Sequence, residues 1–247
     1  MRRLIVNADD FGLHSSVNHG IIEGYRQGCL RSTSFVAAGR AAEEAAALAH
    51  DNPGLGVGIH LTLVAERPIL PPEQIPSLMG ENGYLLPDHT AFIRRYISGG
   101  IRKEELYAEC EAQILFALKL GVRLSHIDSH HHIHIKWFIL PIVVKVAKKY
   151  KLNRIRIIRN IGSTGIDLFF RRIWKFYLRL LYPSVVTTRF FGAYSSFLKL
   201  HSNSCSKNDL IELMCHPGGK EKYNDEEKLL YSDSVFNYNI KINYNDI

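Results

Sequence analysis

The sequence predicts an α/β fold, an irregular (β/α) barrel of about seven parallel strands in a single domain over residues 1–247. Apolar, strand-like runs alternate along the chain with amphipathic or alanine-rich segments, and repeated βα units place their strands in parallel. Several of these runs end in Asp or His, which is typical of barrels whose active site forms at the carboxyl ends of the strands. No segment has the composition of a flexible linker.

The first part of the chain gives five elements and a long loop. Strands are predicted at 3–8, 32–37 and 55–63, and helices at 17–28, with Ser15 or Ser16 as its cap and Gly28 as its stop, and at about 41–50. Residues 66–88 hold five of the nine prolines but also many apolar side chains. This composition favours a packed loop over a site.

The second part continues the alternation. The periodicity predicts helices at 103–121, up to about residue 150 and at 166–182, and strands at 124–130, 154–158 and 210–216.

Composition and charge narrow the function classes. The four cysteines are far apart and form no CxxC pair, so they are expected to be reduced thiols, and with no signal-peptide pattern the expected location is cytoplasmic. The net charge is +7, and much of the excess lies between Lys136 and Arg189 among aromatic and aliphatic residues. No nucleic-acid motif accompanies it, so nucleic acid is not expected as a partner.

The stretch DSHHHIHIK at 128–136 concentrates histidine after a predicted strand. If strand alternation continues through it, Asp128, His130, His132 and His134 share one face. Other predicted strands also end in ligand or acid/base residue types, and together these candidates are Asp9, Asp10, His60, Asp128, His130 and His216.

Two imidazoles and one carboxylate are a common catalytic ligand set for a divalent metal. His60, His130 and one of Asp9 and Asp10 could supply it, the other aspartate could act as general base, and His216 could protonate a leaving group or stabilise an oxyanion. Hydrolysis of an ester or amide fits this set best.

Structural alternatives stay open for each of these candidates. Asp9 and Asp10 could form a turn or cap, and His216 could be a buried histidine bonded to backbone. His126, His131 and His132 could equally have structural or supporting roles.

Six motifs together resemble the YdjC-like family, which includes chitooligosaccharide deacetylases and the hopanoid-biosynthesis-associated protein. The motifs are VNADDFGL at 6–13, VNHGI at 17–21, STS at 32–34, GVGIHLTL at 56–63, HIDSHHHIH at 126–134 and ELMCHPG at 212–218.

The resemblance implies a metal-dependent deacetylase of N-acetylated amino sugars on a distorted (β/α) barrel. It implies Asp9 as the base, Asp10, His60 and His130 as metal ligands, and His216 as the catalytic histidine. It also implies magnesium, whereas a site with two histidines chemically favours zinc, manganese, cobalt or nickel.

Rival functions are a metal-dependent phosphoesterase and a catalytically silent sugar-binding protein. The expected partner is an acetylated amino sugar, and a homodimer is one open oligomeric state. The basic, aromatic helix at 166–182 is expected to pack its broad apolar face on the barrel, and the alternative is contact with a membrane or a lipid-linked sugar.

Overall fold

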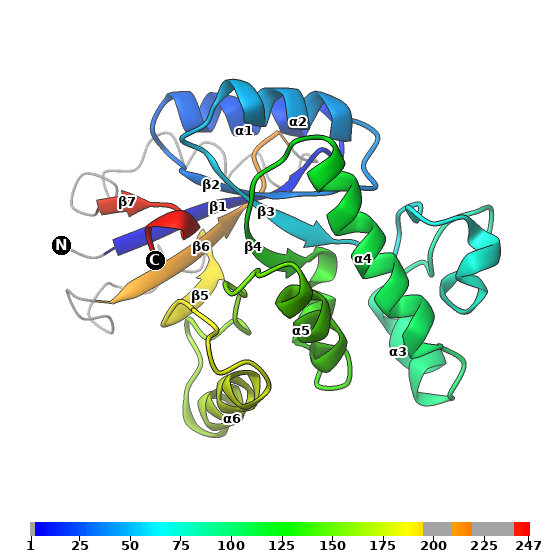
Figure 1. The fold of residues 1–247 in the computed structure, drawn as a ribbon. Helices are drawn as coiled ribbons and strands as arrows, with labels where there is room; N and C mark the ends of the chain where they lie inside the picture. Colours follow the sequence, from blue (N-terminus) through cyan, green and yellow to red (C-terminus); the bar gives the residue numbers. More distant parts are fainter. Residues whose placement is uncertain (1–2, 195–208, 219–239) are drawn as a thin grey trace.

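A computed structural model describes residues 3–194, 209–218 and 240–247, and its centre is a parallel sheet (Figure 1). The strands are β1 (Arg3–Phe11), β2 (Ser32–Phe35), β3 (Gly56–Leu61), β4 (Leu124–Ser129), β5 (Phe190–Ala193), β6 (Leu210–Cys215) and β7 (Ile240–Ile242). Their order is β4-β3-β2-β1-β6-β5, and β7 pairs with the start of β1. The sheet curls into a half-barrel, so the predicted irregular barrel of about seven parallel strands is confirmed.

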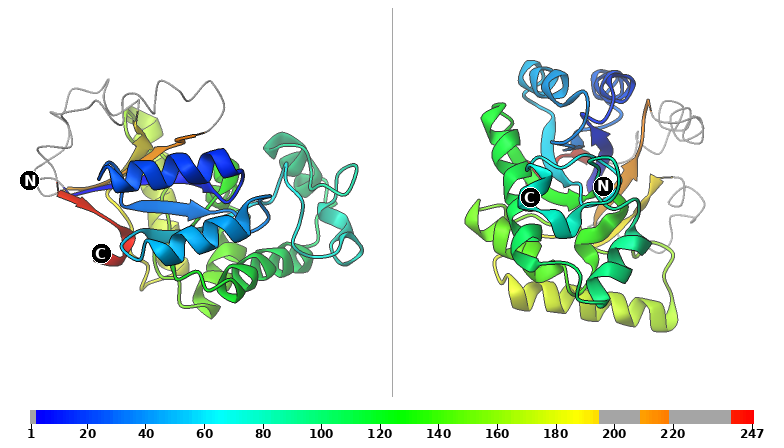
Figure 2. Two further views of the ribbon diagram at one scale, coloured as in Figure 1. Left: turned by 90° about the horizontal axis from the view of Figure 1, so that it is seen from above. Right: turned by 90° about the vertical axis from the view of Figure 1, so that its right-hand side faces the viewer.

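Helices surround the curled sheet. They are α1 (Ser15–Arg26), α2 (Ala42–Asp51), α3 (His89–Ile97), α4 (Lys103–Lys119), α5 (Leu140–Lys149) and α6 (Gly165–Leu181). α1 and α2 lie side by side above the sheet in Figure 1, and α4, α5 and α6 follow around its side and lower edge (Figures 1 and 2). No helix in the described part of the chain has the length and apolar character needed to cross a bilayer.

The strand predicted at 154–158 is wrong. This segment makes two isolated bridges, Ile127 with Ile155 and Arg154 with Val186. Farther along, the amides of Asn160 and Ile161 donate to the carbonyl of Phe191 in β5. The segment therefore bonds β4 at one position and β5 farther along, and it forms no strand of its own.

Two local predictions about helix α1 have different outcomes. Gly28 ends the turn after α1 with a φ of 74°, a left-handed conformation that glycine adopts at little cost, so it is confirmed as the stop. The predicted serine cap is wrong, because the cap position is His14 and its side chain makes no capping bond. Ser15 lies inside the helix and donates to Glu44 of α2.

The core fills both sides of the sheet. Every residue of β3 is buried, as expected for a parallel strand covered on both faces. Cys29, Cys110 and Cys215 are buried thiols without a disulfide in the described residues, and Cys205 lies outside them.

Candidate active site

The candidate side chains meet at the carboxyl ends of the strands, where a barrel places its active site. They line two adjoining cavities of about 470 and 400 Å³ that share Asp9, Asp10, His130 and His216, and His60 lines the second. The structure thus brings together all five residues that the sequence singled out for metal binding and catalysis.

A β-bulge in β1 turns both aspartates toward the cavities. In a regular strand, neighbouring side chains point to opposite faces. Between Ala8 and Phe11, however, β1 holds one residue more than its partner β2, and Asp10 adopts a φ of 72°. The Asp10 carbonyl does accept a turn bond from the Leu13 amide, but neither aspartate side chain caps α1.

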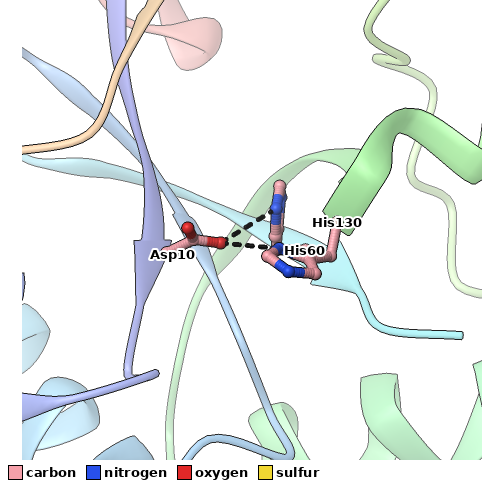
Figure 3. Close-up of side chains that lie close together, drawn as sticks. All are labelled: Asp10, His60 and His130. Atoms are coloured by element: carbon pink, nitrogen blue, oxygen red, sulfur yellow. Dashed lines mark hydrogen bonds and ion pairs between the residues drawn. The ribbon is translucent and has the colours of Figure 1, made fainter. Parts of the chain in front are cut away.

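Asp10, His60 and His130 form a compact donor group (Figure 3). Asp10 Oδ1 lies 2.9 Å from His130 Nδ1 and 3.4 Å from His60 Nε2, and one ligand atom from each residue falls within 4.8 Å of the others. His60 Nδ1 bonds Asp128 Oδ1 at 2.8 Å, which orients the ring as carboxylates do behind metal-binding histidines. These residues therefore fit one divalent ion, and two nitrogen donors suit a transition metal better than magnesium.

A second group of similar spacing, Asp9, His60 and Asp128, fits a metal less well. Both of its carboxylates are already ion-paired with the buried guanidinium of Arg156. A cation placed there would meet an existing positive charge.

Protonation of His60 should compete with metal binding. Burial works against the charged ring, but Asp128, Asp10 and Asp9 outweigh it and raise the pKa of His60 to about 10. Because the ligand must be neutral, binding releases this proton below that pKa, and zinc affinity should rise by up to about tenfold per pH unit between pH 6 and 9. Calorimetric titration would measure the slope. Asp128→Asn, which removes the largest favourable charge, should flatten it, and an affinity independent of pH in the wild type would contradict the prediction.

Arg156 is the electrostatic centre behind the cavity, and the sequence did not identify it. The buried guanidinium donates to both oxygens of Asp9 at 2.7 Å, lies 2.5 Å from Asp128 and donates to Glu212 at 2.6 Å. Burial alone would raise the pKa of Asp9, but Arg156 outweighs it and the pKa is lowered. Asp9 is therefore an oriented, ionised carboxylate at neutral pH.

Polar side chains from neighbouring strands complete this network. Asn7 donates to Asp9 and Ser34 donates to Asp128, each at 2.8 Å. At the far side Tyr244, near the end of the chain, donates to Glu212, and burial raises the pKa of Glu212 to about 7. Ser34, which belongs to the STS motif, therefore orients Asp128, and Asp128 orients the ring of His60.

His216 is held at the cavity by close contact between α1 and the loop after β6. Ala8 pairs with Cys215, so His216 follows at the level of Asp9. A Cβ on Gly20 of α1 would lie 2.7 Å from the Gly218 amide nitrogen, closer than atoms can approach. Gly20 therefore has to be glycine for the loop to sit where it does.

Gly20→Ala should displace the loop that carries His216. Overpacking of this kind costs about 1–3 kcal/mol, and part of that cost should be relieved by moving residues 217 and 218. We expect turnover to fall by about tenfold or more while metal content is unchanged. Glu23→Ala, on the exposed face of the same helix, is the control. Full activity of Gly20→Ala in steady-state assays would show that the position of this loop is unimportant.

The alternation predicted through the histidine run is wrong. β4 ends at Ser129, and residues 130–135 form 3₁₀ turns in which His131 and His132 have φ near 50°. His130 reaches the donor group, whereas His134 is buried and bonds Ser129 and the carbonyl of Arg156. His134 is thus a structural residue and does not share a face with the candidate ligand His130.

Of the three histidines with open roles, His126 has a structural role, and His131 and His132 lie in the cavity wall. His126 is buried and stacks on Tyr244 with ring centroids 3.9 Å apart. His131 lines both cavities and His132 lines the second, and neither belongs to the donor group.

The loop at 66–88 reaches the site through its first residue, Glu66, which lines the larger cavity. Two buried glutamates of α4 hold the rest of the loop. Glu109 accepts from the amides of Ile69 and Leu70, and Glu105 accepts from that of Ser77. The prediction of a packed loop is confirmed. The anchoring role of Glu105 and Glu109 was not predictable, because in the sequence of α4 they have the pattern of solvent-exposed glutamates.

Comparisons with known proteins agree with this architecture. The model of the family described as YdjC-like protein matches residues 3–240. Two relatives named carbohydrate deacetylase come from Halalkalibacterium halodurans (35% identity; 87% of this chain, 84% of the relative) and Vibrio campbellii (33% identity; 90% and 80%).

A solved structure from Enterococcus faecalis, of a protein named for cellobiose-phosphate cleavage, matches with a TM-score of 0.80. Its sequence is 32% identical, and the match covers 99% of this chain and 98% of that one. The family model spans nearly the whole described chain, and the relatives exceed 30% identity over most of their length. The chain belongs to the YdjC-like family.

Proposed function

We propose that this protein is a metal-dependent carbohydrate deacetylase that hydrolyses the N-acetyl amide of an amino sugar. The observation that carries the proposal is the Asp10, His60 and His130 donor group beside Asp9 and His216 in one cavity. The relatives named carbohydrate deacetylase support the reaction class and the acetylated sugar as substrate.

The roles follow from where each side chain lies. A divalent ion held by Asp10, His60 and His130 would polarise the amide carbonyl and acidify the attacking water. Asp9 lines the cavity as an ionised carboxylate and takes the proton from that water as its oxygen bonds to the acetyl carbon. His216 donates a proton to the nitrogen as the carbon–nitrogen bond breaks, releasing acetate and the free amine.

Arg156 tunes Asp9 in two opposing ways. It fixes the carboxylate in one orientation, which favours proton transfer, and it lowers the pKa, which weakens the base. The attacking water therefore has to lie within hydrogen-bonding reach of the fixed carboxylate.

Acetate release from acetylated chitooligosaccharides, measured together with metal content, tests the proposal. We expect release that a chelator abolishes and added zinc, manganese or cobalt restores, with no hydrolysis of p-nitrophenyl phosphate. Asp10→Asn is the matched inactive control. Phosphate-ester hydrolysis without acetate release would favour the phosphoesterase, and sugar binding without either reaction would favour a silent binding protein.

A further inference from the structure

Helix α6 turns its apolar face away from the protein. Trp174 and Leu178 are its buried residues, and the Trp174 ring nitrogen donates to the carbonyl of Ile135. The side chains that we call the apolar stripe are between 37% and 75% exposed, and they are Ile166, Phe169, Phe170, Ile173, Phe176 and Leu180. The expectation that the broad apolar face packs on the barrel is therefore wrong.

The stripe is continuous along one side of the helix. At about 100° per residue its six members fall within an arc of about 120°. Figure 2 (right) shows α6 along the edge of the molecule. Elsewhere in the described chain, large exposed apolar side chains are fewer, on α3, on α4 and at Trp137. An exposed patch of this kind marks an interaction surface.

The surroundings of the stripe are strongly basic. Arg172 and Arg179 are exposed and lie within about 60° of Phe176 around the helix. α6 itself has four Lys or Arg residues and one acidic residue, Asp167, which pairs with Arg171.

Aromatic side chains extend the stripe on its other flank. Trp137 is 46% exposed, and its ring centroid lies 5.4 Å from that of Tyr177 of α6. Trp and Tyr favour the boundary between lipid and water because their rings are apolar and carry one polar group.

We propose that the apolar stripe docks on an anionic membrane surface, with α6 lying in the plane of the interface. An apolar face with Arg on its flank and Trp and Tyr at its edge is the composition of such helices. A second copy of the chain fits less well, because a symmetric dimer through this face would bring two basic regions together. Negatively charged lipid headgroups complement the same charge.

The helix that carries the apolar stripe, α6, packs against the wall of the cavity. Ile135, whose carbonyl holds Trp174, and Lys136 line the cavity that contains Asp10 and His60, and Trp137 follows directly. A membrane bound at α6 would therefore lie beside one side of the site. Membrane binding through α6 does not depend on turnover at the site, so the two can be measured separately.

Flotation with vesicles tests the proposal on the full chain. We expect binding to vesicles of phosphatidylcholine with phosphatidylglycerol at least about tenfold tighter than to phosphatidylcholine alone, and weakening in high salt. The double variant Phe169→Gln with Phe176→Gln should lose at least about tenfold in affinity, because two exposed phenylalanines no longer enter the interface. Ile97→Gln with Leu115→Gln, which removes exposed apolar residues from α3 and α4, should bind as the wild type does.

Charge and fluorescence give independent readouts if the phenylalanine variant folds poorly. Arg172→Gln with Arg179→Gln should weaken binding to anionic vesicles and reduce its salt dependence. Trp174 is buried, so a blue shift of tryptophan emission on binding should come from Trp137 and vanish in Trp137→Gln.

Three results would overturn the proposal. One is no binding of the wild type to anionic vesicles at low salt. Another is equal binding by the folded phenylalanine variant. The third is a stable dimer in analytical ultracentrifugation that the phenylalanine variant disperses, which would make a second copy the occupant.

Discussion

Asp9→Asn should lower deacetylation by roughly 10²- to 10⁴-fold, the usual contribution of a positioned base, while the bound metal remains. Asp9 lies outside the favoured donor group and in the cavity wall, so its carboxylate is available to the water and not needed by the ion. Asparagine keeps the shape of the side chain and one oxygen for Arg156. Steady-state kinetics and metal analysis on the purified variant check both parts.

Changes at the proposed metal ligands, including the neighbouring Asp10, should have a different effect from Asp9→Asn. Asp10→Asn, His60→Ala and His130→Ala should lose metal and activity together, because each removes a donor. Asparagine tolerates the φ of 72° at position 10, so this change tests the ligand without straining the backbone. His216→Ala should keep the metal and slow turnover. An Asp9→Asn protein without metal beside an Asp10→Asn protein with a full equivalent would reverse the two roles.

Strand ends were predictable from the sequence because they depend on local pattern. Apolar runs that stop at Asp or His located His60 and His216, and parallel topology brought these ends to one edge of the sheet. The direction of Asp10 was not predictable in this way. It depends on a bulge, which is a mismatch between β1 and β2 and exists only once the two strands pair.

The buried ion-pair network around Asp9 and Asp128 joins residues that are distant in the sequence, and most of it was not predicted. Arg156 lies in RIRII, whose alternation predicted a strand and gave no reason to place a guanidinium among three carboxylates. Glu212 lies inside the apolar run LIELMC, and a charged residue at a buried strand position was the available signal. A buried charge requires a partner, so Glu212 implied a buried cation somewhere in the fold.

Arg156→Met should destabilise the metal-free protein by about 3–5 kcal/mol at neutral pH, because it leaves Asp9, Asp128 and Glu212 buried without their cation. Arg154→Met is the control. Its guanidinium bonds the carbonyl of Ile247 and lies half-buried, so the loss should be about 0–1 kcal/mol. Urea unfolding in the presence of a chelator measures both.

The pH dependence identifies the cause of that loss. In the wild type the pKa values of Asp9 and Asp128 are lowered against the opposing effect of burial, mainly by Arg156, so their contribution to stability is present above the unfolded pKa of about 4 and is lost in acid. Without the guanidinium, mainly His60 still opposes burial, so the pKa values of both carboxyls should rise and their contribution to stability at neutral and higher pH should be lost. Glu212 follows this second pattern in the wild type, with a pKa of about 7.

The difference in stability between wild type and Arg156→Met should therefore be larger at pH 8 than at pH 5.5. Arg156→Lys, which restores a charge without the fork geometry, should recover part of the loss at pH 8. An equal loss at both pH values would mean that Arg156 stabilises the fold by packing, and that the carboxylates behind the cavity do not need its charge.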